Sequence, residues 1–197
     1  MSASEYRSKW DFRRTSEPQG SLERDASQQP LFVIQRHDAS RTHYDFRIEA
    51  GGVLKSWAVP KGPSTDPREK RLAIPTEDHP VEYADFEGVI PKGEYGAGTV
   101  LIWDRGAYRN ITENSGEIEP TVAALEAGHL LIELAGHKIS GGYVLHRTGS
   151  GDSARWLLIK LDDAHADARR NPVSTEPESV QSGRTIEQIA AEEGRAQ

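Results

Sequence analysis

The chain has 197 residues, contains no cysteine and carries a formal net charge of −7 with an isoelectric point near 5.5. Without cysteine it forms neither disulfide bonds nor cysteine-based zinc sites, and its acidic balance argues against indiscriminate coating of nucleic acid. Its length predicts a single domain, and the lack of a signal sequence or a long apolar run predicts a soluble, cytoplasmic protein with no membrane partner.

Short apolar runs separated by glycine and proline dominate the middle of the chain. Residues 1–30 are polar and predict an N-terminal arm. Strands are then predicted at residues 31–35, 42–48, 53–59, 71–75, 99–104, 130–134, 142–147 and 155–160. Because only one internal helix is expected, near residues 120–127, this pattern favours an antiparallel barrel or sandwich over a doubly wound sheet.

The end of the chain, residues 163–197, is polar and acidic and predicts a C-terminal tail. Within it, Thr185 is a natural N-cap for a short helix over residues 186–191. Such a helix is marginal in isolation and has to dock on the rest of the molecule to persist. The expected organisation is an arm (1–30), a β domain (31–162) and a tail (163–197).

Residues 35–47 combine the residue types that bind metals and phosphates. Since side chains alternate along a strand, His43, Asp45 and Arg47 are expected to share one face. The other face is expected to be anchored by Tyr44, Phe46 and Ile48. Imidazole and carboxylate bind a divalent metal and a guanidinium grips an oxyanion, so this face predicts a metal beside a phosphate, with His37 as a third ligand. The alternative is an ordinary polar surface.

Three further positions admit both a functional and an ordinary interpretation. Lys61 lies in a rigid Pro-Lys-Gly-Pro turn, where an ammonium can lie over a cleft or simply solvate the turn. Arg71 begins the next apolar run and admits the same two interpretations. His79, between a carboxylate and a proline, suits an acid or a phosphate contact, or else a turn residue bonded to backbone.

The glycines of residues 88–98 do not match a Walker loop, which needs Gly-Lys followed by Ser or Thr. They predict a tight hairpin turn instead. The remaining candidates, His129, His137 and His146, are dispersed among apolar runs and are predicted to be structural.

Five segments together carry a resemblance to a known family: residues 32–37, 43–47, 54–62, 79–83 and 88–91. In these segments the chain resembles the 3′-phosphoesterase domain of bacterial DNA ligase D and its free-standing relatives. Residues 179–186 are similar to the segment that joins this domain to the ligase module in larger relatives. The resemblance implies a mainly β fold, a single compact antiparallel β-barrel with a few surface helices and polar N- and C-terminal arms.

The resemblance also implies an activity. Members of the family use manganese, or another divalent transition metal, to trim the 3′ end of a primer strand in end-joining repair. They remove a terminal ribonucleoside and then the remaining 3′ phosphate, which leaves a 3′ hydroxyl. The implied substrates are DNA or RNA-tailed primer-template ends, and the implied partners are a DNA ligase, a repair polymerase and a Ku-type end-binding protein.

Site residues carry over by position. The implied metal ligands are His37, His43 and Asp45, and the implied phosphate contacts are Arg47 and His79. Further positions that match residues in or near the family site are Gln35, Lys61, Arg71 and Tyr83.

In the N-terminal arm, which is implied to contribute to the site, Asp11 and Glu17 match acidic positions that matter for removal of the ribonucleoside. Trp10 departs from the family pattern, which has a basic residue there. Ribonucleoside removal is therefore expected to suffer before phosphate removal does, unless Arg13 or Arg14 supplies the missing charge.

Other functions and steps stay open. The attacking group is either water or, for the ribonucleoside, the adjacent 2′ hydroxyl. A competing enzyme class is a non-haem iron 2-oxoglutarate oxygenase, in which His43 and Asp45 form a facial triad with His146, and Arg147 anchors the cosubstrate. The third function is a non-catalytic module that holds DNA ends.

Overall fold

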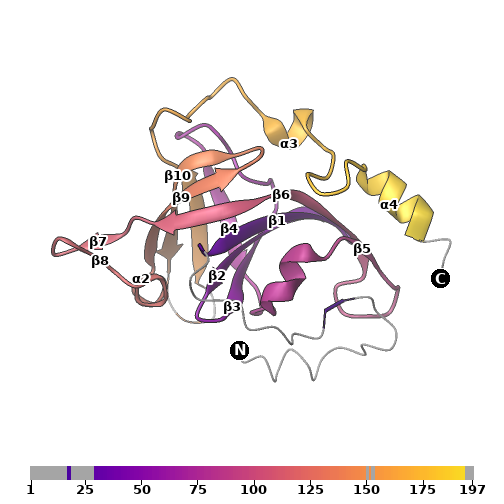
Figure 1. Cartoon of the computed structure of the whole chain (residues 1–197), viewed down its shortest axis with the longest axis horizontal. Helices are drawn as coiled ribbons and strands as arrows, with labels where there is room; N and C mark the ends of the chain where they lie inside the picture. The colour runs from indigo at the N-terminus through magenta and orange to yellow at the C-terminus, as the bar shows by residue number, and fades with distance from the viewer. Residues whose placement is uncertain (1–16, 19–28, 150, 152–153, 194–197) are drawn as a thin grey trace.

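The computed structural model describes residues 17–18, 29–149, 151 and 154–193 (Figure 1). Most of them build one antiparallel barrel. Its neighbouring strands are, in order, β1 (Leu31–Asp38), β2 (Thr42–Ala50), β3 (Val53–Val59), β4 (Lys70–Pro75), β11 (Arg155–Lys160), β10 (Ser140–Thr148), β9 (His129–Gly136) and β6 (Gly98–Asn110). Pairing of β6 with β1 closes the ring. The predicted mainly β fold and its antiparallel barrel are thus confirmed.

Smaller elements decorate this barrel. The strand β5 (Gly88–Ile90) pairs with β6, and the hairpin of β7 (Glu113–Asn114) and β8 (Glu117–Ile118) projects to one side (Figure 1). The helical elements are short: η1 (Val81–Asp85), α2 (Thr121–Ala127), α3 (Pro172–Thr175) and α4 (Ile186–Glu193). No helix in the described part of the chain is long and apolar enough to span a membrane.

The strands extend beyond their predicted ends where ring closure supplies pairing partners. The strand β1 continues through His37 and Asp38 because both β2 and β6 pair with it there. The strand β6 reaches Asn110 because it pairs first with β1 and then with β9. The short elements β5, β7, β8, η1 and α3 were not predicted, since segments of a few residues carry too little periodic pattern.

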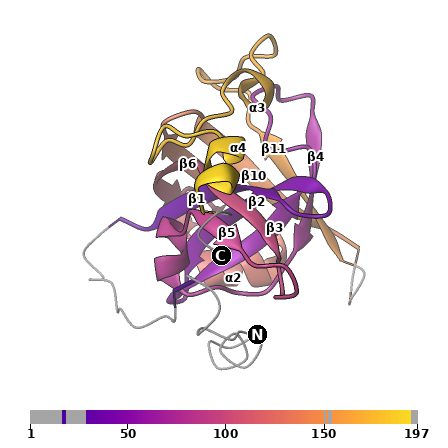
Figure 2. The ribbon, with the colours of Figure 1, turned by 90° about the vertical axis from the view of Figure 1, so that its right-hand side faces the viewer.

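The predicted C-terminal helix α4 packs against the barrel instead of extending away from it. In Figure 2 it lies beside β5 and β6. Its apolar residues Ile186 and Ile189 are buried in the main core. The Glu176 carbonyl accepts hydrogen bonds from Trp103 Nε1 at 2.8 Å and Lys138 Nζ at 2.7 Å, which ties the preceding segment down as well. This docking supplies the stabilisation that so short a helix lacks in isolation.

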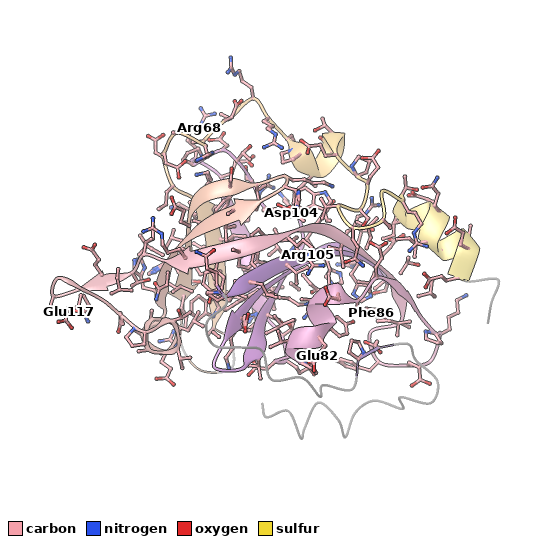
Figure 3. All side chains as sticks on the ribbon, in the orientation of Figure 1. Arg68, Glu82, Phe86, Asp104, Arg105 and Glu117 are labelled. Carbon is pink, nitrogen blue, oxygen red and sulfur yellow. The ribbon has the colours of Figure 1, made fainter. Side chains whose placement is uncertain are left out.

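Apolar side chains cover both faces of one part of the barrel wall. Inside, the core includes Phe46, Trp57 and Trp103. Outside, a second cluster packs Tyr83 of η1 and the next residue after this helix, Phe86, against residues of β1, β3 and β6. Figure 3 labels Phe86 beside η1. The other members of this cluster are Val33, Leu54, Ala84, Ile90, Val100 and Ile102. The outer face of β1 and β2 is therefore partly sheltered from water, and the candidate site lies there.

Candidate active site

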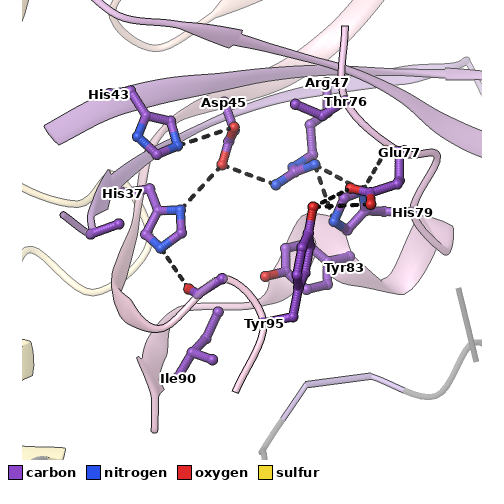
Figure 4. Close-up of a pocket in the computed structure, with 12 residues that line it drawn as sticks. His37, His43, Asp45, Arg47, Thr76, Glu77, His79, Tyr83, Ile90 and Tyr95 are labelled. Atoms are coloured by element: carbon purple, nitrogen blue, oxygen red, sulfur yellow. Dashed lines mark hydrogen bonds and ion pairs between the residues drawn. The ribbon is translucent and has the colours of Figure 1, made fainter. Parts of the chain in front are cut away.

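A pocket of about 210 Å³ opens on this sheltered outer face (Figure 4). Its floor comes from β1 and β2, which contribute His37, His43, Asp45 and Arg47. Its walls come from Thr76, Glu77 and His79 after β4, from Tyr83 of η1, and from Ile90, Tyr95 and Gly96 around the connection between β5 and β6. Segments far apart in sequence thus enclose one polar patch of sheet.

Two histidines and one aspartate converge at the floor. The β1–β2 register sets His37 directly opposite His43, and Asp45 is two residues further along β2, on the same face. His37 Nδ1 lies 3.7 Å from Asp45 Oδ2, and His43 Nε2 lies 3.6 Å from Asp45 Oδ1. One ligand atom from each residue fits within a 4.8 Å span. The expected alternation holds, since Tyr44, Phe46 and Ile48 are buried in the core on the other side.

Backbone carbonyls fix which nitrogen of each ring faces the aspartate. His37 Nε2 lies 2.9 Å from the Gly96 carbonyl, and His43 Nδ1 lies 2.9 Å from the Arg41 carbonyl. A carbonyl only accepts, so these two nitrogens carry the protons and donate. In the neutral rings, His37 Nδ1 and His43 Nε2 therefore present lone pairs to the carboxylate. Metal-binding histidines characteristically donate the other ring N–H to a carbonyl or carboxylate in this way.

The separations also suit a shared cation. At 3.6 and 3.7 Å the nitrogen–oxygen pairs are too far apart for hydrogen bonds. Ligands that each lie ~2.1 Å from one ion are roughly 3–3.7 Å from each other, depending on the angle between them. Two imidazoles and one carboxylate form a donor set suited to a divalent transition metal. The three residues therefore fit a metal ion, without specifying which one.

A buried arginine lies beside these three residues. The guanidinium of Arg47 donates through Nε to Gln35 Oε1 (2.8 Å), through Nη1 to Ser56 Oγ (2.9 Å) and through Nη2 to Asp45 Oδ2 (3.1 Å). These bonds use three of its five N–H donors. Nη1 also lies 3.0 Å from His79 Nδ1 and 3.5 Å from His79 Nε2. The guanidinium is thus held rigidly with donor capacity left on the pocket side.

Burial and charge set the protonation of Asp45. Burial alone raises the pKa of its carboxyl, but the charge of the neighbouring Arg47 guanidinium is the largest opposing cause, and the pKa is lowered to about 2. Asp45 is therefore ionised at neutral pH, which is the form that binds a cation.

His79 is held as a neutral ring. Its backbone pairs with Leu54, with N···O distances of 2.8 and 3.1 Å, and its Nδ1 donates to the Glu77 carbonyl at 2.8 Å. Burial and the neighbouring Arg47 lower the pKa of His79 to about 3. At neutral pH its Nε2 consequently carries a lone pair.

A further set of contacts links η1 and the N-terminal arm to the site. Gln35 Nε2 donates to the carbonyls of Tyr83 (3.0 Å) and Phe86 (2.9 Å), so its Oε1 is oriented to accept from Arg47. The Tyr83 hydroxyl donates to Glu17 Oε1 at 2.9 Å, and the Arg47 guanidinium lies 5.0 Å from the Tyr83 ring centre. The position of Arg47 is thus supported by direct contacts to Gln35 and Tyr83, and Glu17 in turn holds Tyr83.

Sequence comparison assigns this constellation to a family. The sequence profile of the DNA ligase D 3′-phosphoesterase domain matches residues 35–147. The chain belongs to this 3′-phosphoesterase family. It is 49% identical over 186 residues to the multifunctional non-homologous end joining protein LigD of Pseudomonas aeruginosa. This match covers 92% of the chain and 21% of the Pseudomonas protein.

Mycobacterial relatives are similar over a slightly shorter stretch. The multifunctional non-homologous end joining DNA repair protein LigD of Mycobacterium tuberculosis is 48% identical over 156 residues, and LigD of Mycolicibacterium smegmatis is 43% identical over 159. These matches cover 79% and 80% of this chain but only 19% and 20% of the relatives. The chain thus spans about a fifth of the length of these LigD proteins.

The predicted site residues of this 3′-phosphoesterase domain fall into three groups. The pocket is lined by His37, His43, Asp45, Arg47, His79 and Tyr83, and Gln35 and Glu17 bond to residues of this set. Lys61 and Arg71 instead line a second pocket of about 320 Å³, together with Lys70 and Glu69. Asp11 and Trp10 lie outside the described residues.

The oxygenase ligand set is not assembled. His146 lies on β10 opposite His129, with 3.4 Å between the two Nδ1 atoms, and the Arg147 guanidinium stacks over Trp156. His37 completes the group around His43 and Asp45 instead.

Several residues that line the pocket or bond to its residues were not predicted. Ser56 bonds to Arg47, Gly96 accepts from His37, and Glu77 and Tyr95 form part of the wall. Ser56 carried a usable pattern, since it alternates with the inward-facing Trp57 on a predicted strand. Gly96, Glu77 and Tyr95 come from loops whose approach to the sheet depends on the tertiary fold.

Proposed function

We propose that this chain is a metal-dependent phosphoesterase that processes the 3′ ends of DNA. The observation that supports this most directly is the orientation of His37 and His43, whose accepting nitrogens both face the ionised Asp45 beside the buried Arg47. Family membership names the reaction class, and a cation site next to a guanidinium is the arrangement that a phosphate ester requires.

His37 Nδ1, His43 Nε2 and Asp45 would hold the metal, and we propose manganese as the ion that serves in the cell. When bound, such an ion supplies Lewis-acid polarisation of a phosphoryl oxygen and neutralises its charge. The protein itself fixes the ligands, because the Gly96 and Arg41 carbonyls set both histidine tautomers before any ion arrives.

Arg47 and His79 would bind the scissile phosphate. Gln35, Ser56 and Asp45 lock the guanidinium in place, so its remaining donors are already oriented toward an oxyanion and need no reorganisation during the reaction. His79 Nε2 would accept a hydrogen bond from a protonated phosphate oxygen or from an attacking hydroxyl. That attacking group is water or, for a ribonucleoside end, the adjacent 2′ hydroxyl.

The proposed substrate is a primer-template end, and the proposed order is removal of a 3′ ribonucleoside followed by removal of the 3′ phosphate. Lys61 and Arg71, in their separate basic pocket, would then contact DNA phosphates, and Asp11 and Glu17 would serve the first step. A ligase, a repair polymerase and a Ku-type protein are the proposed partners, since the similar LigD proteins are named for non-homologous end joining.

One assay tests the reaction. The protein is incubated with manganese and a 5′-labelled primer-template that ends in one ribonucleotide, with a chelated control and with His43→Ala. A matched control is His129→Ala, which removes an exposed histidine of a similar cross-strand pair. We expect shortening to a 3′ phosphate and then to a 3′ hydroxyl in the wild type and in His129→Ala only.

Other outcomes of this assay are informative. Phosphate removal without ribonucleoside removal would indicate that Trp10 has impaired the first step. If neither end reacts although the protein binds the DNA, the catalytic proposal fails and the non-catalytic end-binding function takes its place.

A further inference from the structure

An aromatic side chain stands at the mouth of the pocket without a part in the chemistry proposed above. Tyr95 belongs to the connection between β5 and β6, lines the pocket, and is 54% exposed. Most other aromatic side chains of the described residues are buried in the two cores. An exposed tyrosine ring beside a polar pocket therefore offers a flat apolar surface where a ligand would emerge.

Two contacts hold this ring over the site. The Tyr95 hydroxyl lies 3.0 and 3.1 Å from the two carboxylate oxygens of Glu77, to which it donates from across the pocket (Figure 4). The next residue, Gly96, accepts the hydrogen bond from His37 Nε2 at 2.9 Å. The tyrosine is thus coupled through one peptide unit to a metal-ligating histidine, and its ring position is fixed relative to the floor.

The connection has the backbone freedom to present the ring in this way. Gly93 has a φ angle of 96° and Gly96 a φ angle of 76°. Residues other than glycine rarely adopt such positive φ angles. These two glycines flank Glu94 and Tyr95, so the chain turns sharply on either side of the ring.

The size and charge of the pocket decide what part of a ligand meets Tyr95. A pocket of about 210 Å³ with His37, Asp45 and Arg47 at its floor takes a phosphate and part of a sugar. The base of the same nucleotide then has to lie at the mouth, where Tyr95 and Ile90 supply apolar surface. The Glu77 carboxylate on the same rim disfavours a second phosphate there, which leaves the uncharged base as the matching group.

Resting on the proposed function, we propose that Tyr95 forms a stacking subsite for the nucleobase at the 3′ end of the substrate, with Glu77 orienting its ring. Stacking of a base on an aromatic side chain is tolerant of sequence, because every base has a π face. The subsite would therefore position any 3′-terminal nucleotide over the metal ligands without selecting among bases.

The test compares two 3′-phosphate oligonucleotides that differ only at the terminal residue, which carries a normal base in one and is a base-free tetrahydrofuran in the other. For Tyr95→Ala we expect KM for the base-bearing end to rise roughly tenfold, within the range of base–aromatic stacking, and KM for the base-free end to stay within about twofold. Tyr95→Phe keeps the ring but loses the hydrogen bond to Glu77, so we expect a smaller rise in KM than in Tyr95→Ala, again for the base-bearing end only. Ile118→Ala, an equally exposed apolar residue (54%) on the β7–β8 hairpin, is the matched control.

Equal losses on both ends in Tyr95→Ala would mean that the residue only shapes the loop, and no loss on either would mean that the ring contacts no base; each result overturns the proposal. Fluorescence anisotropy with the same two oligonucleotides under chelation separates this failure from that of the proposed function. If no end is processed under any metal, the enzyme assignment falls, yet a base-dependent loss of affinity in Tyr95→Ala still supports the stacking subsite.

Discussion

Two cross-strand histidine pairs on the outer surface of the same barrel have different chemistry. His37 faces His43 across β1 and β2, and His129 faces His146 across β9 and β10. The ring centres are 4.9 Å apart in the first pair and 5.5 Å in the second. Among the described residues, only the first pair belongs to a group of three possible metal ligands. Two opposed histidines alone therefore do not make a metal centre.

The difference comes from what covers each wall of the barrel. Beside His37 and His43, η1 and the loops around it cover the sheet, and the strands β1 and β2 are buried on both faces over much of their length. The strand β9, which carries His129, alternates between buried positions and positions that are half-exposed or exposed. A covered wall has to satisfy every polar group with a partner, and these partners fix tautomers and charge at the site.

The largest expected effect separates the two pairs by activity. His37→Ala removes a proposed metal ligand and should lower the rate of 3′-end processing by more than the ~10–100-fold that loss of a supporting partner costs. His146→Ala changes a histidine of the open pair and should leave the rate within about twofold. Steady-state assays on the same 3′-phosphate substrate compare them. Equal rates in the two variants would remove the distinction between the pairs.

The sequence predicted the part of this contrast that depends on neighbouring residues, and it missed the part that depends on contacts between distant segments. The alternation that groups His43, Asp45 and Arg47 on one face is local, and so is the apolar anchoring on the other face. The supporting contacts of Gly96, Glu77 and Tyr95 come from the connections after β4 and β5, which reach β1 only through the folded chain. Sequence periodicity carries no information about such approaches.

The ends of the barrel strands could not be predicted from local sequence patterns either. Residues 36–38 are polar, yet they continue β1 because β2 pairs with them on one side and β6, which closes the ring, pairs with them on the other. Family resemblance singled out the barrel where periodicity left a barrel and a sandwich open, and it named the same three metal ligands that the residue pattern had already suggested. Lys61 and Arg71, which the resemblance groups with the site, line a pocket of their own. Their assignment to DNA binding remains a prediction.

Metal binding should stabilise the folded chain through the first pair alone. An ion that binds only the folded state adds about 2.7 kcal/mol to the free energy of unfolding at a concentration 100 times its Kd. Urea titrations with and without manganese measure this gain. We expect it in the wild type and in His146→Ala, and not in Asp45→Asn, which weakens the carboxylate ligand while keeping its shape. A full gain in Asp45→Asn would place the ion elsewhere.

Acid should destabilise the covered wall through His79. Burial and Arg47 lower the pKa of His79 from 6.5 to about 3. Between these two pH values, His79 is protonated in the unfolded chain and neutral in the folded chain. The free energy of unfolding therefore decreases as the solution is acidified, by about 2 kcal/mol from pH 6.0 to pH 4.5. Asp45, with its pKa lowered to about 2, contributes only at more acidic pH, because its stabilisation is present above 3.8 and is lost as pH falls toward 2.

Replacing His79 with glutamine should flatten this pH dependence, which urea denaturation at several pH values measures. The exposed His129 provides the control, since His129→Gln makes the same substitution on the open wall of the barrel. An unchanged slope in His79→Gln would contradict the burial of a neutral ring at this position.

The smallest effect is expected for the open pair itself. In His129→Ala the lost ring is exposed, and its contact to His146 is a long 3.4 Å approach between two Nδ1 atoms. Surface substitutions of this kind change the free energy of unfolding by no more than about 0.5 kcal/mol. A loss several times larger in thermal or urea denaturation would mean that the two rings form a buried or ion-bridged unit in solution. The contrast between the covered His37–His43 pair and the open His129–His146 pair would then not hold. In both pairs, a group that binds the two imidazoles would contribute to stability.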